Sequence, residues 1–226
     1  LVVGMVLDEA GFPKATETWK GDTQDSVTLD QMLDRLESRV GRREETTVVM
    51  DRGIATAENV ARLRERGYHY IVALAAQSRY KWISEIRESE FHPLDQHHSG
   101  IEVSVKRKEG ESYLLVRSRD RMAKDKGIRE RFTERLEKAL GELASRVASG
   151  KLDAKRAREK IGRLRQKYQR ASRFFITEIE EREGRLQLEW RIDERKLEEA
   201  RLLDGLYILK TDRGDLQDQR LWSLYV

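Results

Sequence analysis

The alternation of hydrophobic and polar residues divides this chain of 226 residues into segments with different periods. Residues 1–7 and 13–19 have strand character and flank a short turn that contains Gly11, which predicts a β-hairpin. Apolar residues at helical spacing then predict a helix that ends at Gly41, and they are Leu29, Met32, Leu33, Leu36 and Val40. Asp25 or Ser26 is the expected N-cap of this helix.

A strand at residues 46–51, a helix at 56–66 and a strand at 68–74 follow. Hairpin, helix, strand, helix and strand in this order are typical of an α/β sheet. Residues 206–212 restore the apolar strand pattern, and residues 217–226 begin another amphipathic helix.

The pattern between these two parts has a different character. Residues 101–107 with 113–118, and residues 174–181 with 186–192, predict two further β-hairpins. The charged region between them, residues 119–173, carries two narrow apolar stripes separated by Ser149 and Gly150. Such stripes predict an antiparallel helical hairpin with a coiled-coil seam, whose first helix of about 30 residues would span about 45 Å.

The expected organisation is therefore one α/β domain interrupted by an insertion. Residues 1–77 form the first part of the core, residues 78–203 the insertion domain of β-hairpins and charged helices, and residues 204–226 the returning strand and the start of the last helix. Because the chain begins at Leu1 and stops inside a helical pattern, it is expected to be a fragment.

Composition narrows the possible functions. Charged residues make up 38% of the chain and hydrophobic residues 38%, which favours long solvated helices over one tight globule. The net charge of +4 permits nucleic acid binding, and the absence of cysteine excludes disulfides, thiolate catalysis and cysteine-ligated zinc. No segment approaches the ~20 apolar residues that a membrane span needs, so no membrane partner is expected.

Asp51 is the leading candidate for chemistry, because it ends an apolar strand just before a new helix. Ligands and metals gather at the carboxyl ends of strands in open α/β sheets. The alternative is a turn or helix-capping aspartate.

Five stretches resemble DDE transposases of bacterial insertion sequences, in the IS4-like group and closest to its IS1634-type members. They are Leu1-Val-Val-Gly-Met-Val-Leu-Asp8, Gly21-Asp-Thr-Gln-Asp-Ser26 with Thr28 and Leu29, Val48-Val-Met-Asp-Arg-Gly53, Gly67-Tyr-His-Tyr-Ile-Val72, and Asp204-Gly-Leu-Tyr-Ile-Leu-Lys-Thr211. They occur in the family order and cover nearly the whole chain.

This resemblance implies an RNase H-like mixed sheet, interrupted by the insertion, in which two Asp and one Glu hold two Mg²⁺ or Mn²⁺ ions for in-line phosphoryl displacement on DNA. Asp51 matches the second of these carboxylates. The first would precede Leu1 and the Glu would follow Tyr225, so this chain alone is not expected to cleave DNA. The implied partners are terminal inverted repeats, target DNA and a second copy in a homodimer. The implied location is the cytoplasm of a bacterium, in association with the nucleoid.

Two other classes of function remain open at this stage. One is a non-catalytic transposase remnant that binds only DNA or an intact transposase. The other is a phosphotransferase of the haloacid dehalogenase type, which would need an Asp-x-Asp motif after an early strand, and none is present.

Several other residues are candidates for contacts. Arg52 and Lys210 are expected to contact DNA phosphates. The basic second helix of the insertion is expected to do the same through Lys155, Arg156, Arg158, Arg163 and Arg165. A solvated coiled-coil surface is the alternative for the helix. A loop with His92, Asp95, His97 and His98 is read as solvated rather than as a metal site, Asp25 as a cap, and Trp222 and Tyr225 as packing residues.

Overall fold

The computed structural model describes residues 1–43 and 45–226, and it divides the chain into two compact units. The first unit contains residues 1–82, 88–117 and 207–226, and the second contains residues 83–87 and 118–206. The polypeptide thus leaves the first unit and returns to it.

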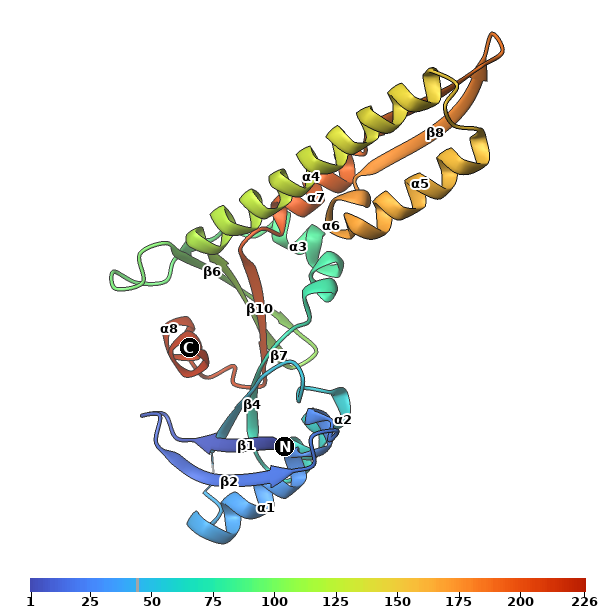
Figure 1. The fold of residues 1–226 in the computed structure, drawn as a ribbon. Coiled ribbons are helices and arrows are strands. Elements are labelled where there is room, and N and C mark those ends of the chain that lie inside the picture. Colours follow the sequence, from blue (N-terminus) through green and yellow to red (C-terminus); the bar gives the residue numbers. More distant parts are fainter. Residues whose placement is uncertain (44) are drawn as a thin grey trace. The chain divides into compact units, whose positions relative to one another are not determined.

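The first unit is built on a mixed six-stranded sheet in the order β3-β4-β10-β7-β6-β5 (Figure 1). The strands in chain order are β3 (Thr47–Met50), β4 (His69–Ala73), β5 (His92–Pro93), β6 (Ile101–Lys108), β7 (Glu111–Ser118) and β10 (Leu206–Thr211). β4 pairs in parallel with β3 and antiparallel with β10. The hairpin β6–β7, which the sequence analysis assigns to the insertion, is therefore part of this sheet.

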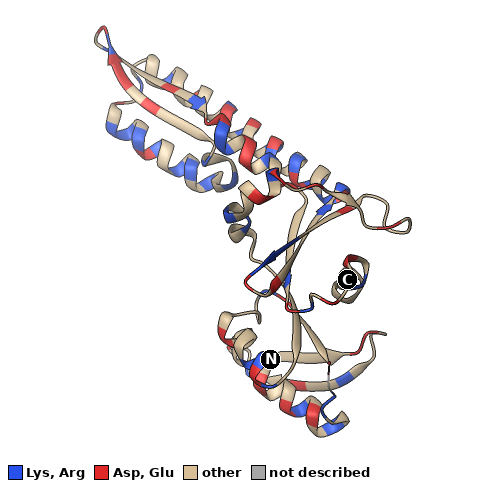
Figure 2. Cartoon of the chain, turned by 180° about the vertical axis from the view of Figure 1, so that it is seen from behind, with Lys and Arg blue, Asp and Glu red and all other residues tan. Residues whose placement is uncertain are grey.

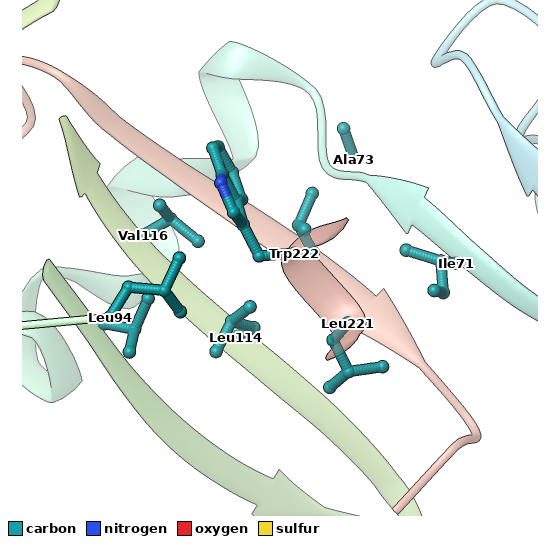
Figure 3. Close-up of a cluster of buried hydrophobic side chains, with 9 residues drawn as sticks. Ile71, Ala73, Leu94, Leu114, Val116, Leu221 and Trp222 are labelled. Atoms are coloured by element: carbon teal, nitrogen blue, oxygen red, sulfur yellow. The ribbon is translucent and has the colours of Figure 1, made fainter. Parts of the chain in front are cut away.

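Helices cover both faces of the sheet around β4. On one face, α1 (Leu29–Val40) and α2 (Ala57–Glu65) contribute to a cluster that includes Tyr70 and Val72. On the other face, α8 (Asp218–Tyr225) inserts Leu221 and Trp222 among Ile71 and Ala73 (Figure 3). The burial of Trp222 confirms that it packs on the inner face of the helix. Burying an apolar side chain such as Leu221 contributes about 1.5–3 kcal/mol to stability.

The first hairpin has the predicted strands but not the expected sheet. β1 (Val2–Leu7) and β2 (Pro13–Trp19) pair antiparallel as a separate two-stranded sheet that contacts α1. The Asp8 carboxylate closes the turn by accepting the N–H groups of Ala10 and Phe12, at 3.1 and 2.8 Å. A 3₁₀ turn, Asp25–Val27, follows the hairpin, and a second one, Ala76–Trp82, follows β4.

The second unit contains the predicted helical pair and one hairpin. Its elements are α3 (Ile83–Arg87), α4 (Arg119–Ala148), α5 (Ala154–Lys167), α6 (Gln169–Ser172), β8 (Phe175–Arg182), β9 (Arg185–Ile192) and α7 (Glu194–Leu202). The 30 residues of α4 confirm the predicted length. The chain departs from regular helix at Tyr168 (φ −115°, ψ 44°), so α5 and α6 replace the one continuous helix expected there.

The apolar stripe of α4 is not a simple two-helix seam. Its middle part, including Leu136 and Leu140, packs with residues of α6 and α7. Its C-terminal part, including Leu143 and Val147, packs with α5 and with Leu188 of β9. A two-stranded sheet is stable only when one of its faces is covered. The apolar stripe of α4, which would form the seam of a coiled coil, packs against β9 instead.

Candidate functional site

Asp51 lies directly after β3, at the carboxyl end of this strand, and its side chain is exposed. One carboxylate oxygen, Oδ1, accepts the N–H of Arg52 at 2.7 Å. The backbone carbonyl of Asp51 accepts the N–H groups of Ile54 and Ala55, both at 3.1 Å, and this closes a tight turn. The cap of the following helix is Thr56, whose hydroxyl accepts the N–H of Asn59 at 3.1 Å. Asp51 is therefore a turn residue that is not needed as a helix cap.

The last helix brings Tyr225 into electrostatic range of this turn. Burial raises the pKa of the Tyr225 hydroxyl, the negative charge of Asp51 raises it further, and the positive charge of Arg52 lowers it. Trp222 anchors the same helix, with its ring 6.1 Å from that of Tyr225. The Asp51 carboxylate therefore lies close enough to the end of α8 for its charge to act on the Tyr225 hydroxyl.

This arrangement predicts opposite effects of two charge substitutions on the pKa of Tyr225. Asp51→Asn removes a negative charge but keeps an oxygen that can accept the Arg52 N–H, so the pKa of Tyr225 is expected to fall. Arg52→Gln removes a positive charge, so the pKa is expected to rise. An alkaline NMR titration of the tyrosine ring carbons measures both shifts, with Tyr225→Phe identifying the signal. An unchanged pKa in both variants would contradict the proximity of Asp51 to α8.

Asp25 does not cap the first helix, so that prediction is wrong. The helix α1 begins after the 3₁₀ turn, its N-cap is Thr28, and no side chain caps it. The Asp25 carboxylate instead lies against Gly53, where a Cβ atom would be 3.2 Å from Oδ2. A second carboxylate therefore borders the turn that carries Asp51. Its sequence signal is the polar run Gly21-Asp-Thr-Gln-Asp-Ser26, in which the sequence analysis favours capping.

Lys210 lies in β10 opposite Val72, on the face covered by α1 and α2. Its ammonium group is 2.8 Å from Oε2 of Glu111, a residue that is 9% exposed. Burial favours the neutral form of Glu111, but hydrogen bonds from Lys210, Tyr70 and Tyr113 outweigh it and lower the pKa of this carboxyl. The pair with a buried carboxylate argues against the phosphate contact expected for Lys210. Glu111 carries no signal of this role in the sequence, because a lone Glu after a turn usually faces solvent.

Arg52 differs from Lys210 in having an exposed side chain beside Asp51. It remains available for an anionic ligand, since no ion pair engages it within the described residues.

The histidine-containing loop is organised by Asp95. This carboxylate accepts the N–H groups of His97 and His98, at 2.8 and 2.7 Å, and lies 2.8 Å from the His98 ring. His92 contacts Asp218 of α8 instead, at 3.2 Å. Over residues 1–43 and 45–226, no three His, Asp or Glu side chains are grouped closely enough to hold a metal ion.

The five basic candidates of the insertion all lie on α5, in the second unit. Their side chains are exposed, and they are Lys155, Arg156, Arg158, Arg163 and Arg165. Arg165 also donates a hydrogen bond to the Thr177 hydroxyl of β8 at 2.8 Å.

None of the helices in the described residues has the length and apolar character needed to cross a bilayer.

Comparisons with known proteins place this chain in a family. No curated protein and no solved structure matches the chain significantly. The family described as transposase DDE domain matches residues 3–204, which is most of the chain. The chain therefore belongs to the transposase DDE domain family.

Proposed function

We propose that this chain is part of a transposase that moves a bacterial insertion sequence by DNA strand cleavage and strand transfer, in the IS4-like group and closest to its IS1634-type members. The family match over residues 3–204 carries this proposal. The five ordered motifs support the subgroup. The mixed six-stranded sheet with helices on both faces is consistent with the RNase H-like core that the resemblance implies.

Asp51 is proposed as one of the carboxylates of the catalytic centre, with Arg52 as a contact to DNA phosphate. The exposed position of Asp51 at a strand end, beside α8 and near Asp25, supports its role. Proteins of this family in general use divalent metal ions. The described residues do not by themselves fit a centre for two Mg²⁺ or Mn²⁺ ions, because they contain no group of three Asp, Glu or His side chains that could hold an ion. No catalytic step is therefore assigned to this chain alone.

The proposed partners follow from the family. They are the terminal inverted repeats of the element and the target DNA, with a homodimer holding two DNA ends together. The proposed location is the cytoplasm of a bacterium, where the protein would associate with the nucleoid.

The chain alone is expected not to nick or cut DNA. Asp51 alone supplies too few oxygen ligands to hold two ions about 3.5–4 Å apart. The measurement is conversion of supercoiled plasmid to open circles in Mg²⁺ or Mn²⁺, with EDTA as the blank. Reproducible nicking that disappears in Asp51→Ala would contradict the expected inactivity and would assign Asp51 a catalytic role in this chain.

The coding DNA on both sides of this segment tests the proposed function itself. An open reading frame that supplies a strand-end Asp before Leu1 and a Glu shortly after Tyr225 would support an active transposase. Stop codons or frameshifts at these positions would favour the alternative, a remnant that binds DNA or an intact transposase without catalysis.

A further inference from the structure

Helix α5 carries an unusually one-sided charge. Its 14 residues include seven Lys or Arg and a single acid, Glu159. In the neighbouring α4, nine basic residues are interleaved with six acidic ones. Figure 2 shows the same contrast, with more blue and less red on α5 than on α4, which is banded in blue and red. The interleaved surface of α4 is typical of a solvated helix, whereas that of α5 is not.

The basic residues of α5 lie on two flanks of the helix. Ala157 and Ile161 are buried and define its inner face. One flank carries a row at positions i, i+4, i+7 and i+11, which is Arg156, Lys160, Arg163 and Lys167. At 1.5 Å per residue, this cationic row is about 17 Å long. The opposite flank carries Lys155, Arg158 and Arg165, and Gly162 interrupts it.

Contacts within the second unit neutralise little of the cationic row. Arg156 lies 3.7 Å from the exposed Asp153, and Lys167 lies over the Tyr168 ring. In the described part of the chain, Lys160 and Arg163 form no ion pair. The opposite flank is directed towards β8 through the bond from Arg165 to Thr177. Most of the charged side chains of β8 are acidic.

We propose that the cationic row of α5 binds the sugar–phosphate backbone of duplex DNA without reading its bases. Duplex DNA carries one negative charge per about 1.7 Å of its axis, so a row of this length faces several phosphates. The row contains no Asn or Gln that would recognise adenine and no aromatic ring on which an unpaired base would stack. The choice of DNA as the nucleic acid rests on the proposed function, whereas the choice of phosphate as the ligand rests on the charges of α5.

A matched pair of double variants tests the row. Lys160→Gln/Arg163→Gln removes two cations from it, and Lys155→Gln/Arg158→Gln removes the same residue types at the same spacing from the other flank. Binding of the full chain to a fluorescent DNA duplex of arbitrary sequence is measured by anisotropy over a salt series. The first variant is expected to weaken binding about tenfold or more and to reduce the slope of log affinity against log salt by about 1.8. The second is expected to change the slope by less than half as much.

Three outcomes would overturn the inference. Equal losses in both variants would indicate attraction to net charge, and an unchanged slope in the first variant would exclude the row from the interface. Tighter binding of a duplex RNA of equal length would overturn DNA as the partner. Circular dichroism of both variants verifies that α5 is folded. The proposed function is tested separately by the flanking coding DNA, so either proposal can fail alone.

Discussion

Replacing Arg129 with Met is expected to lower the free energy of unfolding by about 3–5 kcal/mol, because it removes a cationic partner of a buried carboxylate. Arg129 of α4 donates from Nη1 to both carboxylate oxygens of Asp204. The two side chains are only 10% and 11% exposed. Removing one partner therefore removes the attraction and keeps the cost of burying the other charge. Urea denaturation followed by far-UV circular dichroism measures the loss.

Two controls separate burial of the charge from loss of an ion pair. Arg182→Met breaks exposed pairs with Glu180 and Glu189, and it is expected to cost about 0–1 kcal/mol. The double variant Arg129→Met/Asp204→Leu removes both buried charges and is expected to recover most of the stability lost in Arg129→Met. A double variant that is as unstable as the single one would indicate that the two residues stabilise the unit through other contacts.

The local elements of this fold are largely readable from the sequence. The Glu-Gly pairs at 109–110 and 183–184 have positive φ at both residues, and each pair connects the two strands of a predicted hairpin. The strand β3 and the helix α2 lie within two residues of their predicted bounds. The helix α7 was missed, because its apolar pattern is short and the buried residues are Leu197 and Ala200 alone. The cap at Asp193, which accepts the Lys196 N–H at 3.2 Å, was the available signal.

The assignment of strands to sheets is not encoded locally. The hairpin β6–β7 looks like the hairpin β8–β9 in its period and its turn, yet the first joins the six-stranded sheet and the second remains two-stranded. The difference arises from long-range burial, since Val103, Leu114 and Val116 contact the core under α8. The hairpin β8–β9 instead finds cover on α4. Period alone identifies strands but not their neighbours.

The sequence predicts one residue of the candidate site, Asp51, but it does not predict which side chains lie near it. Asp51 follows from a strand pattern that ends in a carboxylate. Asp25 was misassigned as a cap, because a 3₁₀ turn separates it from α1 and moves its side chain next to Gly53. The partner of Lys210 could not be foreseen, because its contact with Glu111 joins positions that are distant in the sequence.

Replacing Gly205 with Ala is expected to lower the free energy of unfolding by about 3–5 kcal/mol, as the sum of backbone strain and steric overlap. Gly205 has φ +67°, a conformation that residues with a Cβ atom rarely adopt. The new Cβ would lie 2.5 Å from the carbonyl oxygen of Ser118 and 2.6 Å from the N atom of Met122. Both neighbours are backbone atoms, which cannot rotate away as a side chain would.

Gly150 provides the matched control for this substitution. It has φ +71°, but a Cβ there would meet no atom within 4 Å, so Gly150→Ala carries the strain without the overlap. Its expected cost is about 1 kcal/mol. The difference between the two variants, measured by the same denaturation, isolates the steric term at the junction of Gly205 and the start of α4. Equal losses would show that φ alone decides the cost, and that the chain relaxes around Ser118 and Met122 to accept the methyl group.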